Sequence, residues 1–178
     1  LNRSAPIRKT TRRRLPGSPH MAEYRQIDIY AGHSALSFDE SSIRTLFRTL
    51  DNWGRLAIPM GELSIALLTD ESLASLHRTF LQDPSPTDVI TFPGSDPGEA
   101  GEICVSVDTA ASTARDLGLS LSYELNLYLV HGWLHLAGLS DKTPDAAEHM
   151  RRAEEAAFEF LKKNTPLPEF YLRTHHHS

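Results

Sequence analysis

The sequence contains a single cysteine, Cys104, and no long apolar run among its 178 residues. One cysteine excludes a disulfide framework and a cysteine-based zinc site, and such sparse usage is typical of a reducing cytoplasm. No apolar stretch approaches the roughly 18 residues that span a bilayer, so we expect no membrane partner. The basic start is not followed by the apolar segment of a signal peptide, which predicts a soluble, cytoplasmic protein.

Acidic side chains are absent from residues 1–15, which carry six lysines and arginines. Removing these six charges from the net charge of −5 leaves −11 on the rest of the chain. An acidic body must bind any nucleic acid through a local basic cleft or a metal ion rather than through its overall charge. Residues 1–22 are predicted to be a disordered basic tail, suited to nucleic acid, or a vector-derived segment with the cloning-junction pattern GSPHM at 17–21.

Residues 23–168 show no break in composition, and 40% of the chain is hydrophobic, which is enough for one ordinary core. We therefore expect a single domain there, followed by a flexible tail at 169–178. Strand patterns lie at 24–30, 63–68, 89–92 and 102–107. Helical patterns lie at 38–51, 71–81, 108–117, 122–137 and 144–163, the first with a capping box of Ser37 and Glu40. This order predicts an α+β fold, a small mixed β-sheet of about four strands covered by about five helices.

Two histidines four residues apart, His131 and His135, stand in the otherwise apolar stretch LVHGWLHLAGLSD at 129–141. Histidines at this spacing lie on one side of a helix, so they are either core residues or two ligands of one ion. Gly138 is placed to end the helix, and Asp141 follows on the returning chain. Two nitrogens and one oxygen leave a fourth position for water, which predicts a catalytic zinc site of His131, His135 and Asp141. His149 on the following helix is the alternative third ligand.

The residue after His131 is Gly132, where the helix of a zinc protease carries the glutamate that acts as general base. Its absence counts against hydrolysis of peptides or amides. This substrate class otherwise remains open, because the His-x3-His-x5-Asp spacing is similar to that of zinc protease sites.

Three ordered motifs carry a family resemblance. The segment HGWLHLAG at 131–138 resembles the H-G-x-L-H-L-x-G signature of the YbeY-type endoribonucleases, the bacterial rRNA maturation factors. PTDVITFP at 86–93 resembles their P-T-[DN]-V-L-S-F-P segment, and GEI at 101–103 resembles their G-D-I. Met150 stands where the family has a methionine in its last helix. The resemblance covers roughly residues 63–150.

This resemblance implies a small mixed sheet with the metal-binding helix at its centre. It also implies a zinc-dependent, single-strand-specific endoribonuclease that acts on the 3′ end of small-subunit rRNA and in ribosome quality control. The expected partners are single-stranded RNA and the small ribosomal subunit. The chemistry would be hydrolysis of a phosphodiester, in which the ion polarises a phosphoryl oxygen or lowers the pKa of bound water toward about 7.

Two positions depart from the family. The motif of the family ends G-Y-D-H, with the last histidine as third ligand, whereas Asp141 occupies that position here. A carboxylate binds zinc, but its charge lowers the Lewis acidity of the ion and shifts the metal preference toward Mn²⁺. Some members carry an arginine six residues before the motif threonine, where this chain has Leu81. Arg78 is the nearest substitute, either as a catalytic-cleft residue or as a solvated helix arginine.

Three further residues are candidates with two interpretations each. Thr87 and Asp88 line the cleft, as substrate-binding and catalytic residues respectively, or form the turn after Pro86. Trp133 stacks an RNA base or packs in the core. The mixed charges at 148–155 predict a solvated helix face. Because the Asp141 and Leu81 departures affect activity more than fold, the alternative function is a ribosome- or RNA-associated protein with weak or no hydrolytic activity.

Overall fold

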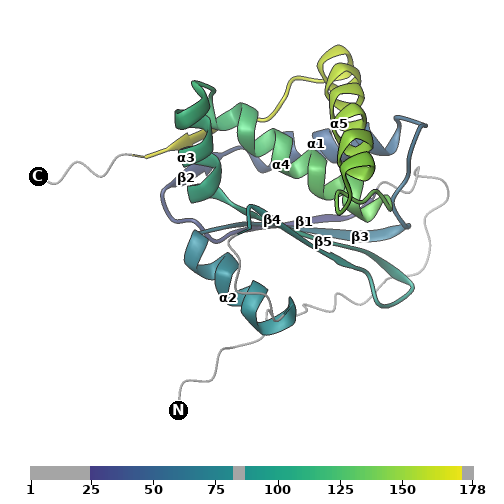
Figure 1. Cartoon of the computed structure of the whole chain (residues 1–178), viewed down its shortest axis with the longest axis horizontal. Coiled ribbons are helices and arrows are strands. Elements are labelled where there is room, and N and C mark those ends of the chain that lie inside the picture. Colours follow the sequence, from purple (N-terminus) through teal and green to yellow (C-terminus); the bar gives the residue numbers. More distant parts are fainter. Residues whose placement is uncertain (1–24, 82–86, 174–178) are drawn as a thin grey trace, which may run out of the picture.

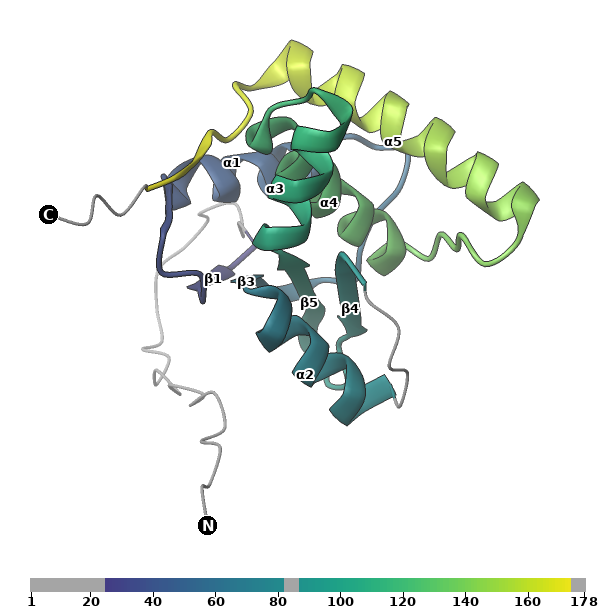
Figure 2. The same ribbon diagram turned by 60° about the vertical axis from the view of Figure 1, so that its left-hand side comes forward.

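The computed structural model describes residues 25–81 and 87–173. The predicted basic tail, residues 82–86 and the last five residues of the predicted C-terminal tail, 174–178, lie outside these ranges. A four-stranded sheet forms the middle layer, with helix α2 (Asp70–Leu81) on one face and the other four helices on the opposite face (Figures 1 and 2). The predicted α+β class, with a mixed sheet of four strands and five helices, is therefore confirmed.

The sheet has the strand order β1-β3-β5-β4. Strands β1 (Ile27–Ala31), β3 (Gly61–Leu68) and β5 (Gly98–Ser106) are parallel, and β4 (Val89–Pro93) runs antiparallel to β5 at the edge. Side chains of β5 alternate between the two faces, so Ile103 and Val105 pack in the main core while Cys104 packs toward α2. Burial raises the pKa of the Cys104 thiol, which disfavours the reactive thiolate.

The five helices follow the predicted periodicity within a few residues. On the large face lie α1 (Glu40–Asp51), α3 (Val107–Leu117), α4 (Leu121–Leu136) and α5 (Pro144–Asn164). The inner face of α1 is fully buried, as its spacing predicts. The predicted capping box is wrong: Asp39 caps α1, accepting a hydrogen bond from the backbone N–H of Ser41 at 2.9 Å, because Ser37 belongs to a strand.

That strand, β2 (Leu36–Phe38), pairs antiparallel with β6 (Phe170–Leu172), and neither was predicted. Phe170 is 2% exposed, and its ring lies 5.9 Å from that of Phe38, measured between centroids. The Ser122 hydroxyl accepts a hydrogen bond from the backbone N–H of Phe170 at 2.9 Å, which joins β6 to the start of α4. Residues 170–172 are therefore part of the fold, and the prediction of a flexible tail from residue 169 needs this correction.

Helix α4 is the centre of the molecule, packed against α3, α5, β4 and β5. A β-carbon added at Gly132 would lie 2.5 Å from Cγ2 of Ile103, so only glycine permits this close approach of α4 to β5. The two glycine-containing motifs HG and GEI therefore meet at one helix–strand contact. None of the helices in the described part of the chain is both long and apolar enough to cross a membrane.

Candidate metal centre

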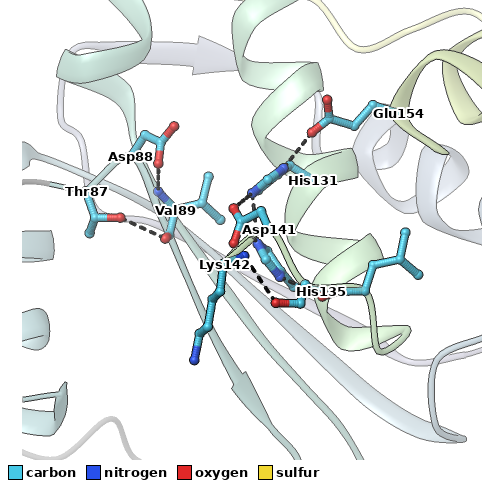
Figure 3. Close-up of polar contacts among 10 residues, drawn as sticks. Thr87, Asp88, Val89, His131, His135, Asp141, Lys142 and Glu154 are labelled. Carbon is cyan, nitrogen blue, oxygen red and sulfur yellow. Dashed lines mark hydrogen bonds and ion pairs between the residues drawn. The ribbon is translucent and has the colours of Figure 1, made fainter. Parts of the chain in front are cut away.

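The last two turns of α4 and the loop after it bring three side chains to one point (Figure 3). The Nε2 atoms of His131 and His135 lie 2.9 Å apart, and each lies 3.5 Å from Oδ2 of Asp141. Zinc–ligand distances of about 2.0–2.1 Å give a tetrahedral site edges of roughly 3.3 Å. The three donor atoms are therefore spaced like one face of such a tetrahedron.

The loop reaches this point because α4 ends at Leu136 and the chain turns at Gly138, which has a φ of 97°. The backbone N–H of Leu139 donates to the carbonyl of Leu134 at 3.0 Å, which closes the helix end. Only glycine adopts this left-handed conformation at little cost. The predicted glycine stop is confirmed, and it explains why Asp141 returns to the histidines.

The outer nitrogens of both rings face hydrogen-bond acceptors. Nδ1 of His135 lies 3.0 Å from the carbonyl oxygen of Leu139, and Nδ1 of His131 lies 2.5 Å from Oε1 of Glu154. Because these oxygens accept, each Nδ1 carries a hydrogen, and a neutral ring then has its lone pair at Nε2. Two lone pairs 2.9 Å apart repel one another unless a cation or a proton lies between them. The donor set therefore fits a metal ion.

The surrounding charge is negative. Burial acts to lower the pKa of His131, but the hydrogen bond that its ring donates to Glu154 and the charges of Glu154, Asp141 and Asp88 outweigh it and raise the pKa. Both histidine side chains are about three-quarters buried, whereas that of Asp141 is 44% exposed. The group therefore attracts positive charge and is accessible from the side of Asp141.

Glu154 is the site residue that the sequence prediction missed, since it was assigned to a solvated helix face. Its side chain is only 16% exposed. It comes four residues after Met150 and three before Ala157, both of which are buried on the inner side of α5. A carboxylate on this apolar stripe is the signal that would have identified it.

Thr87 and Asp88 lie beside the group, immediately before β4 (Figure 3). The Thr87 hydroxyl donates to the carbonyl of Val89 at 3.1 Å, and Oδ1 of Asp88 accepts from the backbone N–H of Val89 at 2.9 Å. Both contacts are turn interactions. Asp88 is exposed, and its charge contributes to the raised pKa of His131.

Three other candidates lie elsewhere. Trp133 is fully buried and packs on Trp53 with ring centroids 6.3 Å apart, so of its two interpretations the core role holds and RNA stacking is wrong. Arg78 is exposed on α2, across the sheet from α4 (Figure 2), and is not brought to the three donor atoms. Exposed His149 is not part of the metal-competent group found among the described residues, which consists of His131, His135 and Asp141.

The fold and the site together define a class of protein. It is an α+β domain with a candidate single-metal centre, in which the central helix and its return loop present His, His and Asp to one point. The family model described as Endoribonuclease YbeY matches residues 29–162. The chain therefore belongs to the YbeY family, and the resemblance stated from the three motifs is confirmed.

Relatives named Endoribonuclease YbeY agree with this membership. One from Thermobifida fusca is 33% identical over 135 residues, covering 70% of this chain and 86% of the relative. One from Myxococcus xanthus is 32% identical over 139 residues, covering 71% of this chain and 47% of the relative. One from Anaeromyxobacter dehalogenans is 42% identical over 97 residues, covering 52% of this chain and 50% of the relative. The chain thus spans about half the length of the last two. A solution structure from Thermotoga maritima covers 78% of this chain and 93% of its own, at 24% identity and a TM-score of 0.49.

Proposed function

We propose that this chain is a metal-dependent, single-strand-specific endoribonuclease of rRNA maturation, with one divalent ion held by His131, His135 and Asp141. The observation that carries the proposal is the triangle of donor atoms, 2.9, 3.5 and 3.5 Å apart, at the helix end that bears the family motif. The names of the relatives support RNA as the substrate. We further propose that the substrate is the 3′ end of small-subunit rRNA and that the partner is the small ribosomal subunit. The protein would act in the cytoplasm and also take part in ribosome quality control.

Two imidazoles and one carboxylate favour Zn²⁺, and the carboxylate makes Mn²⁺ the second choice. A bound divalent ion supplies Lewis acidity toward a phosphoryl oxygen and lowers the pKa of water. The residues of the chain would hold the ion in place: the histidines provide fixed nitrogens, and Asp141 provides an oxygen from the exposed side. Lys142, exposed next to Asp141 (Figure 3), is suited to a neighbouring phosphate of the RNA.

A second candidate function is an RNA- or ribosome-associated protein with weak or no hydrolysis. It is favoured by the negative charge of Asp141, which would lower the Lewis acidity of a bound ion, and by the position of Arg78 on α2, which lies across the sheet from α4 (Figure 2). Both observations concern catalysis and phosphate binding, and neither disturbs the fold.

Metal analysis and RNA cleavage together test the proposal. Purified protein should bind close to one zinc per chain at the site, His135→Ala should abolish that binding, and the control His149→Ala should not. Single-stranded RNA should be cleaved by the parent and by His149→Ala but not by His135→Ala. If the parent cleaves no RNA and the Asp141→His variant cleaves it strongly, the proposal of an active endoribonuclease is refuted and the RNA-associated protein is favoured. Site-bound metal that survives His135→Ala would refute the centre itself.

A further inference from the structure

Glu154 contacts the metal centre from another helix. Its Oε1 lies 2.5 Å from Nδ1 of His131, and the two residues are 23 positions apart in the chain, on α5 and α4. We propose that Glu154 is a positioning residue: its carboxylate holds the His131 ring so that Nε2 faces His135 and Asp141. The inference rests on the proposed function only in taking these three residues as metal ligands.

The surroundings of Glu154 are unlike those of a solvated helix glutamate. The arginines one turn earlier, Arg151 and Arg152, form ion pairs with Glu148 and all three side chains are more exposed. Glu154 is 16% exposed and directs its carboxylate to the histidine ring. A buried carboxylate needs a partner, and here that partner is the Nδ1–H of His131.

The two histidines are held differently. His135 donates to the carbonyl of Leu139, a neutral oxygen from the same turn that returns Asp141, whereas His131 donates to an anion from a separate helix. An anionic acceptor makes the opposite ring nitrogen a stronger electron donor. In addition, the formal charges of Glu154 and Asp141 together balance the two positive charges of a divalent ion.

Loss of the carboxylate should therefore free His131 to adopt its other tautomer and to rotate away from the group. Changes in such outer partners typically lower metal affinity by about 10–100-fold. Glutamine at 154 retains an oxygen that accepts from Nδ1–H but lacks the charge, so it should restore part of the affinity that alanine loses.

The test compares Glu154→Ala and Glu154→Gln with Glu155→Gln, a matched control on the next, exposed position of α5. Zinc affinity is measured by competition with a chromophoric chelator, and the tautomer of His131 in the zinc-free protein by long-range proton–nitrogen NMR correlations. We expect Glu155→Gln to match the parent and Glu154→Ala to lose about 10–100-fold in affinity, with Glu154→Gln between them. The NMR spectrum should show the Nδ1–H form in the parent and a mixture of tautomers in Glu154→Ala.

A residue that merely stabilised the fold would lower the melting temperature without changing the tautomer. The proposal is overturned if Glu154→Ala keeps the Nδ1–H tautomer, or if its zinc affinity stays within twofold of that of Glu155→Gln. A parent that binds zinc but cleaves no RNA refutes the proposed function and leaves Glu154 as a positioning residue. A parent that binds no zinc refutes the metal centre, and the tautomer still decides whether Glu154 orients the ring.

Discussion

Substitution of Gly132 by alanine tests the contact that sets the position of α4, the helix that carries the proposed metal ligands His131 and His135. The added methyl group would lie 2.5 Å from Cγ2 of Ile103 and 3.3 Å from its Cγ1. Carbon atoms pack best at about 3.5–4.0 Å, so α4 or β5 must move by about 1 Å. Ile103 is fully buried on β5, which lies between β3 and β4, so little room exists for that movement.

Overpacking of this kind costs typically about 1–3 kcal/mol, and this close contact belongs to the upper end. Alanine regains about 1 kcal/mol of helix propensity over glycine. Gly132→Ala should therefore lose about 2 kcal/mol in the free energy of unfolding, the balance of those two effects. For a domain of this size, that loss lowers the melting temperature by about 4–8 °C. Because His131 and His135 flank the contact, zinc affinity should fall as well.

Urea unfolding of a double-mutant cycle with Ile103→Ala measures the contact directly. Removing the side chain of Ile103 makes room for the new methyl group, so Gly132→Ala should cost clearly less in that background, with a coupling above about 1 kcal/mol. Equal stability of Gly132→Ala and the parent, or additive effects in the cycle, would refute the close-packing explanation.

Three further results are expected. Burial acts to raise the pKa of Asp70, but hydrogen bonds led by the Ser106 hydroxyl outweigh it and lower the pKa. The stability that the Asp70 carboxylate contributes should be complete above its ordinary pKa of 3.8 and should be lost as the pH falls through the lower pKa of the folded state. Asp70→Asn should therefore flatten the decline of stability at acidic pH, measured by urea unfolding at a series of pH values. Phe170→Ala should cost about 3 kcal/mol in urea unfolding if β6 is part of the fold, whereas exposed Tyr171→Ala should cost below about 0.5. Lys142→Ala should weaken RNA binding at all sequences and reduce the salt slope by about 1; an unchanged slope would exclude a phosphate contact.

The features of the fold that could be predicted from the sequence are those with a local cause. The apolar stripe of α1 and the alternation around Ile103 depend on helical and strand periodicity, and both appear in the structure as expected. Strands β2 and β6 have three residues each and pair across more than 130 positions, so no local pattern identifies them. The choice of Asp39 over Ser37 as helix cap depended on that same pairing.

The candidate metal centre likewise has a part that could be predicted from the sequence and a part that could not. His131, His135 and Asp141 share one helix end and its return loop, so their spacing alone placed them together. Glu154 depends on how α5 packs against α4, which is a tertiary relation that spacing along one helix does not contain. The burial of Trp133 also depends on packing, because its ring lies on the side of α4 that Trp53 covers, and no local pattern along α4 shows that contact.

Zinc-soaked crystals, with the ion located by its anomalous signal, test the central claim most directly. We predict one ion bound by Nε2 of His131, Nε2 of His135 and Oδ2 of Asp141, at distances of about 2.0–2.2 Å. An ion held by His149 in place of Asp141, or no ion at these three side chains, would contradict the account.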